Sequence, residues 1–221
     1  MRYSIAGVFV MLMFLLSVRG QADLAHWDYI FQTESSGGGA GAWFGTHPAA
    51  SDGFDPPSSD PYAPVDRVIL AGYSEYVATY HNSATEGNTW TGSSGFYSTD
   101  RRAPLILSPG LSKTWTIYAW AVPSLSANLI TIPLYWSSYS SISNIFHFTL
   151  TLKSKPGGIT GGPDEGTIWD LSAQPNGWVR LPIFRTDNGL EGYVFDFTAT
   201  VIPEPSSLAA LCLGACPSIS K

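Results

Sequence analysis

The chain has 221 residues, of which 44% are hydrophobic and only 13% are charged, and its formal net charge at pH 7 is −6. Binding to a nucleic-acid backbone requires a basic surface, so this acidic composition excludes nucleic acid as the partner. The two cysteines, Cys212 and Cys216, lie near the C-terminus, which excludes disulfides, thiol catalysis and cysteine-ligated metal from the rest of the chain.

Residues 1–22 have the features of a secretory signal peptide. Arg2 supplies a positive charge before the apolar run at residues 5–18, and Ala22 is the small residue before a cut at Asp23. The apolar run is shorter than the roughly 20 residues that a membrane-spanning helix needs. We therefore expect export through the secretion machinery and cleavage between Ala22 and Asp23.

Glycine and proline are abundant, with 22 and 16 residues, and they separate short apolar runs. Within these runs apolar and polar residues alternate, as at Phe146, Phe148 and Leu150, which predicts strands with one buried and one solvated face. Strands are expected at residues 24–33, 41–46, 67–73, 75–81, 114–122, 129–136, 146–153, 177–184 and 193–201. Residues 23–202 are therefore predicted to form a single all-β domain, an antiparallel two-sheet sandwich of Ig-like or jelly-roll-like type.

Two short connections predict hairpins. Asp187, Asn188 and Gly189 fit a tight turn with positive φ at its centre, between the last two strands. The connection at residues 123–128 is short enough to pair the strands on either side of it.

The second hairpin would create an outer face of aromatic residues. Tyr118 and Trp120 would lie opposite Trp115, because side chains alternate along a strand, and Tyr135 of the next strand would join them. Flat rings among threonines suit the apolar C–H face of a sugar, so these residues are a candidate glycan-binding face. The alternative is that a neighbouring strand or loop covers them.

Asp52, Asp55 and Asp60 lie close together in a loop rich in proline and glycine, with Asp66 shortly after them. Carboxylate and carbonyl oxygens are the ligands that Ca²⁺ takes, so this loop is a candidate calcium site. The alternative is that the carboxylates cap turns by accepting hydrogen bonds from backbone N–H groups. No other cofactor is predicted.

The sequence contains no recognisable catalytic motif. It has no nucleophile elbow, no zinc-binding His-Glu-x-x-His pattern and no phosphate-binding loop. The histidines are isolated along the chain and are predicted to be neither metal ligands nor catalytic groups: His26, His47, His81 and His147. A carboxylate pair for glycoside hydrolysis is the remaining alternative, but no catalytic residue is predicted and the protein is not expected to be an enzyme.

After the last predicted strand the chain reads Pro203-Glu204-Pro205, followed by an apolar run at residues 208–216. This tail, which extends to Lys221, resembles the bacterial PEP-CTERM sorting signal: a Pro-Glu-Pro motif, a transmembrane helix and terminal arginines. The apolar run is too short to cross a bilayer, and a single lysine stands in place of the arginine cluster. The signal is therefore incomplete, through truncation or a shifted reading frame.

The resemblance implies that the upstream domain is exported cargo at the cell envelope or outer surface, or in the extracellular matrix, of a Gram-negative-type bacterium. It also implies that a membrane exosortase recognises the tail and cuts it near the Pro-Glu-Pro motif. Transient membrane association through the two ends and a connection with exopolysaccharide follow from the same resemblance.

A second resemblance covers roughly residues 40–136. The runs at residues 43–46 and 50–61 are similar to a segment near the start of secreted bacterial Ig-like β-domains of unknown function. The run Asp-Arg-Arg at residues 100–102 and the Trp-led strand at residues 113–118 continue the similarity in the same order. This resemblance implies the Ig-like fold and no activity.

Together these features predict a secreted envelope or exopolysaccharide-matrix protein, non-catalytic, with a structural or adhesive role. One alternative is a carbohydrate-binding module that uses exposed aromatic residues, and another is a glycan-active enzyme.

Overall fold

The computed structural model describes residues 26–33, 40–58, 60, 63–69, 72–86, 90, 94–106, 108–122, 129–138, 145–186 and 189–203. The predicted signal peptide, its cleavage site between Ala22 and Asp23, and Glu204 and Pro205 of the sorting motif lie outside these residues. Pro203 lies within them and is exposed after the last strand. Within the described ranges, no helix is long and apolar enough to cross a membrane.

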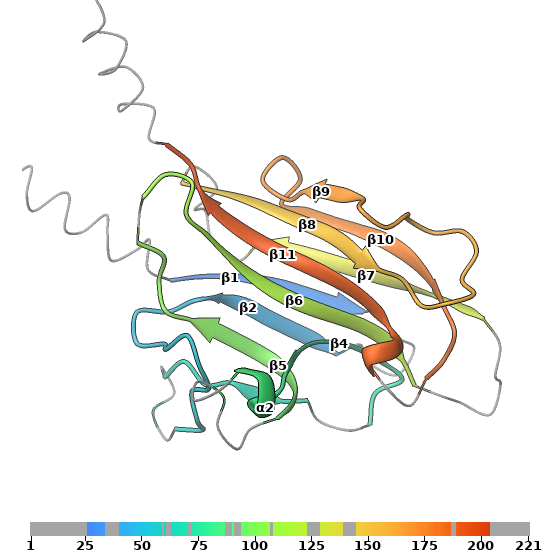
Figure 1. Ribbon diagram of the computed structural model, residues 1–221, viewed down its shortest axis with the longest axis horizontal. Helices are drawn as coiled ribbons and strands as arrows, with labels where there is room; N and C mark the ends of the chain where they lie inside the picture. Colours follow the sequence, from blue (N-terminus) through green and yellow to red (C-terminus); the bar gives the residue numbers. More distant parts are fainter. Residues whose placement is uncertain are drawn as a thin grey trace, which may run out of the picture.

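The described chain is mostly β-structure, which confirms the all-β prediction (Figure 1). Its strands are β1 (Trp27–Thr33), β2 (Gly41–Thr46), β3 (Arg67–Val68), β4 (Glu75–His81), β5 (Gly95–Arg102), β6 (Ser112–Ala121), β7 (Ile130–Ser138), β8 (Phe146–Ser154), β9 (Ile168–Asp170), β10 (Asn176–Ile183) and β11 (Tyr193–Val201). Helical structure is short in this part of the chain: α2 (Ser83–Glu86) and the 3₁₀ turn η2 (Gly189–Glu191).

All eleven of these strands belong to one sheet. The hydrogen-bonded order is β10-β7-β1-β2-β5-β4-β6-β11-β8-β9, and β3 pairs with β5 off this path. Neighbouring strands are antiparallel except for β2 and β5, which are parallel. The prediction of two separate antiparallel sheets is therefore wrong, because the pairings of β5 with β2 and β4 join the two halves into one sheet.

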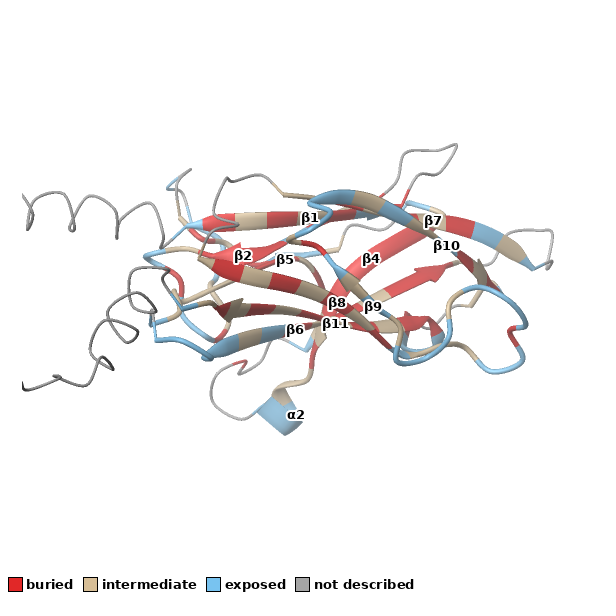
Figure 2. Ribbon diagram, turned by 90° about the horizontal axis from the view of Figure 1, so that it is seen from above, coloured by how far each residue is buried: buried red, intermediate tan, exposed pale blue. Residues whose placement is uncertain are grey.

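The sheet curls so that its two halves lie face to face (Figure 2). Trp27 of β1 contacts rings of the opposite half, with centroid distances of 5.5 Å to Trp115 of β6 and 5.0 Å to Phe148 of β8. The Tyr29 hydroxyl of β1 donates a hydrogen bond to the Leu171 carbonyl, which follows β9 (3.2 Å). The core therefore fills the space between the two halves, as it does between the layers of a sandwich.

The alternation in the sequence corresponds to alternating burial. On β8, Phe146, Phe148, Leu150 and Leu152 are buried and the residues between them are not. Every second residue of β11 is buried in the same way. Each large apolar side chain that leaves water contributes about 1.5–3 kcal/mol, so this inner surface is the main source of stability.

Both predicted hairpins are wrong. β6 pairs with β4 and β11, whereas β7 pairs with β1 and β10, so β6 and β7 belong to opposite halves of the sheet. β10 and β11 also belong to opposite halves, and Gly189 begins η2. Stacked layers lie only about 10 Å apart, and a few extended residues span that distance. A short connection therefore permits a hairpin without requiring one.

The sequence does not predict β5, because its second half, STDRR, is polar although the strand lies near the centre of the sheet. Asp100 on this strand is only 1% exposed. Its Oδ2 accepts a hydrogen bond from Arg102 Nη2 (2.9 Å) and lies 3.1 Å from His81 Nε2. Burial opposes ionisation, but the Arg102 and His81 side chains outweigh it and hold the pKa of Asp100 at about 2.

Trp115 connects this charged cluster to the core. Its indole N–H donates to the Asp100 backbone carbonyl (3.1 Å), and the Arg102 guanidinium lies 5.1 Å from the centre of its ring. The cluster of Asp100, Arg102, His81 and Trp115 therefore ties together β4, β5 and β6.

Asp100→Asn should lower the free energy of unfolding by about 3–5 kcal/mol, because it leaves the largely buried Arg102 charge without its partner. Chemical denaturation at pH 7 measures this change. Asp164→Asn is the matched control, since the Asp164 side chain is 93% exposed and pairs with Lys155 only at the surface. Asp164→Asn should lower the free energy of unfolding by less than about 1 kcal/mol. Equal stability of Asp100→Asn and the parent would contradict a structural role for the cluster.

Candidate functional site

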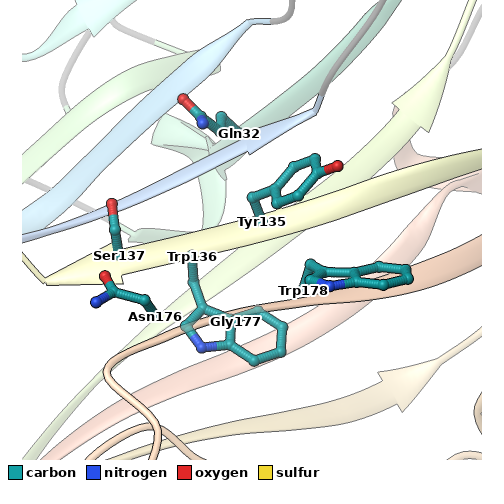
Figure 3. A pocket seen from close by; sticks show the side chains of 7 residues that line it. All are labelled: Gln32, Tyr135, Trp136, Ser137, Asn176, Gly177 and Trp178. Atoms are coloured by element: carbon teal, nitrogen blue, oxygen red, sulfur yellow. The ribbon is translucent and has the colours of Figure 1, made fainter.

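The outer surface of β1, β7 and β10 carries aromatic and amide side chains. β7 lies between the other two strands, and the register sets Gln32, Tyr135 and Trp178 directly beside one another. Leu134 and Trp136, which flank Tyr135 along β7, are buried on the inner side. Figure 3 shows Gln32, Tyr135 and Trp178 on the three adjacent strands, with Trp136 pointing away from Tyr135. We call this surface the Trp178 face; it comprises Gln32, Tyr135, Ser137, Asn176, Trp178 and Arg180.

Trp178 is the most exposed tryptophan of the described chain, at 52%. Its ring centroid lies 6.3 Å from that of Tyr135, and the two rings are tilted by 39°. The guanidinium of Arg180, two residues further along the same strand face, lies 5.3 Å from the centre of the indole. This cation–π contact is worth about 0.5–1 kcal/mol at an exposed site, so it helps to hold the indole in position.

Gly177 has no side chain, so the Trp136 ring of β7 can lie close to the β10 backbone at this point. A Cβ at Gly177 would lie 2.5 Å from Cζ2 of Trp136, so the indole of Trp136 packs directly on the β10 backbone. The same indole donates its N–H to the Gln174 carbonyl (3.1 Å). The run Pro175-Asn176-Gly177 therefore leads into β10, and its glycine is the point where Trp136 packs against the strand that carries Trp178.

Two hollows flank the pair of Tyr135 and Trp178. One has a volume of about 360 Å³ and is lined by Gln32, Tyr135, Trp136, Ser137, Asn176, Gly177 and Trp178 (Figure 3). The other has a volume of about 410 Å³ and is lined by Thr131, Pro133, Tyr135, Trp178 and Arg180. The two rings thus stand between two depressions of similar size.

The chemistry of this lining suits a ligand rich in hydroxyl groups. The aromatic rings offer flat apolar surfaces, while the Gln32 and Asn176 amides and the Arg180 guanidinium offer hydrogen-bond donors and acceptors. Among the described residues that line the two hollows there is no aspartate, glutamate or histidine. The arrangement can therefore bind and orient a polar molecule.

The structure does not bring Tyr118, Trp120 and Tyr135 together. Tyr135 lies on the Trp178 face, whereas the other two belong to β6 in the opposite half of the sheet. Trp120 is only 5% exposed, because its ring stacks on Tyr76 at 5.1 Å. Gly189 of η2 also lies against the ring, and a Cβ there would be 2.9 Å from the indole. For Trp120, the alternative that a neighbouring strand or loop covers it is confirmed, because Tyr76 lies on the neighbouring strand β4 and Gly189 on η2.

Sequence reasoning missed Trp178, Gln32 and Arg180. A signal was present, since strand periodicity in the predicted strand at 177–184 sets Trp178 and Arg180 on the same side, opposite Leu181. A tryptophan that shares a strand face with an arginine indicates an exposed binding surface more strongly than a tryptophan that shares a face with isoleucine or leucine.

The candidate calcium loop makes other contacts. Asp52 pairs with Lys113 of β6, and Asp55 Oδ2 accepts a hydrogen bond from the Ser51 N–H (3.0 Å). Among the residues that the structure describes, no three histidine, cysteine, aspartate or glutamate side chains are gathered as a metal site. Asp55 therefore caps a turn, as the alternative interpretation expects, and calcium binding by Asp52, Asp55 and Asp60 stays a prediction.

His81 is isolated in the sequence, but in the folded chain its ring contacts two carboxylates. Its Nδ1 lies 2.7 Å from Glu86 Oε2 and its Nε2 lies 3.1 Å from Asp100 Oδ2. Two of the other histidines also lie beside an aspartate. His81 is 3% exposed and its ring stacks on Trp90 with a centroid distance of 3.3 Å. A substrate cannot reach so enclosed a ring, so this pairing is structural.

Asp66 is a buried carboxyl group of a different kind. It is 2% exposed, and its Oδ2 accepts a hydrogen bond from the Asp55 N–H (2.8 Å). Its Oδ1 has no hydrogen-bond partner within the described part of the molecule. Burial raises the pKa of Asp66 to about 8, so the group is mostly protonated at neutral pH.

Comparison with protein-family models, with curated proteins and with solved structures gave no match.

Asp66→Asn should flatten the dependence of stability on pH. The folded pKa of about 8 lies above the unfolded value of about 3.9. The native state therefore holds a proton that the unfolded state has lost, and stability falls as pH rises through this window. The loss is up to about 1.4 kcal/mol per pH unit for this one group. Unfolding measured between pH 4 and 8 should show a smaller decline in the variant, and parallel curves would contradict the assignment.

Proposed function

We propose that the protein is a non-catalytic, exported envelope or matrix protein that binds polysaccharide through the Trp178 face. The observation that carries this proposal is the 52% exposure of Trp178, which lies in register with Tyr135 and Gln32 across three strands. A large exposed indole beside a second aromatic ring and hydrogen-bonding amides is best explained by a contact that covers it.

The composition of the face favours a glycan over a protein partner. Sugar rings present C–H groups to an aromatic ring and hydroxyl groups to the amides beside it. The Trp178 face offers both within one short row, with the Gln32 and Asn176 amides next to the two rings. A protein interface of comparable stability would need a broader apolar centre.

Export and sorting form the second part of the proposal. They rest on the signal-like residues 1–22 and on the resemblance of the tail at Pro203 to the PEP-CTERM signal. The exposed position of Pro203, just beyond β11, supports access by a sorting enzyme such as an exosortase. The face-to-face packing of β1 on β6 and β8 supports a relationship to sandwich-type, Ig-like adhesive domains.

Trp178→Ala should weaken binding to polysaccharide at least about tenfold, as the loss of a central tryptophan does at a binding surface. Retardation in gels containing the exopolysaccharide of the host, together with a panel of purified polysaccharides, measures this. Because the indole is exposed, the melting temperature should fall by no more than a few degrees.

Ile168→Ala is the matched control, since Ile168 of β9 is 63% exposed and is not among the described residues that line the two hollows. It should bind like the parent. Equal retention of the parent and Trp178→Ala on every polysaccharide would refute glycan binding by this face. Release of new reducing ends from a bound polysaccharide would refute the non-catalytic part.

A further inference from the structure

A groove of about 850 Å³ lies beside the Trp178 face, over β2, β3 and β5. Its apolar lining includes Trp43, Phe54 and Tyr73, and its polar lining includes Asp60, Arg67 and Arg101. Trp43 and Tyr73 are each 38% exposed, so both rings are accessible from the groove.

Trp43 connects the groove to the Trp178 face. In the pairing of β1 with β2, Gln32 lies opposite Gly41 and Ile30 lies opposite Trp43, so these residues share one surface. Ala42, between Gly41 and Trp43, is fully buried on the other side. A Cβ at Gly41 would lie 3.7 Å from Cη2 of Trp43 and 3.9 Å from Cβ of Gln32, so the indole lies over Gly41 next to Gln32.

The result is one continuous path across the strands. Trp178 on β10 is followed by Tyr135 on β7, Gln32 on β1 and Trp43 on β2. Thr99 of β5, opposite Trp43, lies in the lining of the groove. Adjacent strands are about 4.8 Å apart, so the path from β10 to β5 is about 19 Å long. This is longer than a disaccharide and requires an extended ligand.

Arg180, which lies against the Trp178 indole, is a single cation at one end of the path, and the charges in the groove are balanced, so the path does not select a strongly anionic polymer. Arg101 is neutralised by Asp28, whose two carboxylate oxygens each accept a hydrogen bond of 2.9 Å from it. Arg67 and Asp60 both line the groove and carry opposite charges. The whole chain has a net charge of −6, which repels a polyanion at a distance.

We propose that the Trp178 face and the Trp43 groove bind a single chain of a neutral, ribbon-like, β-1,4-linked polysaccharide that crosses the strands. This inference rests on the proposed function and specifies its substrate class. A β-1,4-linked chain is extended and presents successive C–H faces along a nearly straight line, which matches aromatic rings spaced along one row. A helical, α-1,4-linked chain curves away from such a row after a few units.

The test is calorimetric titration of the full chain with hexasaccharides. The β-linked probes are cellohexaose, mannohexaose and chitohexaose, and maltohexaose is the α-linked control for chain shape. At least one β-linked hexasaccharide should bind about tenfold or more tightly than maltohexaose and than its own disaccharide. Trp43→Ala and Trp178→Ala should each weaken that binding about tenfold, whereas Ile168→Ala should not.

Tyr73→Ala is a second groove variant, and it should weaken the same hexasaccharide without changing the disaccharide. If Trp178→Ala weakens binding while Trp43→Ala and Tyr73→Ala bind like the parent, the bound saccharide does not reach the groove. That result overturns this inference and leaves the proposed function intact. Equal binding of maltohexaose, or no binding of any β-linked hexasaccharide, overturns the substrate class. If polysaccharide is retained equally by the parent and all three variants, the proposed function fails as well.

Discussion

The buried ion pair between Asp100 and Arg102 is the interaction on which the rest of the sheet depends. β5 is the strand at which the sheet changes from antiparallel to parallel pairing, and it joins the half that contains β1 to the half that contains β6. A strand with so polar a sequence can occupy this position only if its charges are neutralised where they are buried. Arg102 neutralises Asp100, His81 lies within hydrogen-bond distance of the same carboxylate, and the Trp115 indole fixes the backbone at the same point.

Arg101, between Asp100 and Arg102 in the sequence, makes its contacts on the opposite side of β5. Arg101 forms a two-point ion pair with Asp28 of β1, and the pair lies over Gly45 of β2. A Cβ at Gly45 would lie 2.7 Å from the Asp28 carboxylate, so a larger residue would displace the pair. Three consecutive residues therefore fix β5 on both of its surfaces. This constraint sets the position of the Trp43 groove relative to the Trp178 face.

Local patterns in the sequence were sufficient to predict several of the strands. The bounds of β2, β4 and β11 agree with the expected ranges 41–46, 75–81 and 193–201. The same reasoning failed for β5, since the burial of Asp100 depends on His81 and Trp115, which come from other strands. Periodicity along one strand cannot show such partners.

For the candidate site too, the sequence predicted the features that depend on one strand and not those that depend on several. Tyr135 was placed on an outer surface correctly, because that depends only on alternation along β7. Trp120 was placed there wrongly, because its cover comes from Tyr76 and from Gly189 of η2, far along the chain. The assembly of Gln32, Tyr135 and Trp178 required the strand order of the sheet, which short connections do not determine.

The most direct test of ligand binding by the Trp178 face is to follow the indole N–H signals of the tryptophans by NMR. The protein would be titrated with the hexasaccharide that binds it most tightly. We expect the signals of Trp178 and Trp43 to move on binding, while those of the buried Trp27 and Trp115 stay in place. Movement of the Trp115 signal with an unchanged Trp178 signal would contradict this expectation, because the ligand would then bind elsewhere on the molecule.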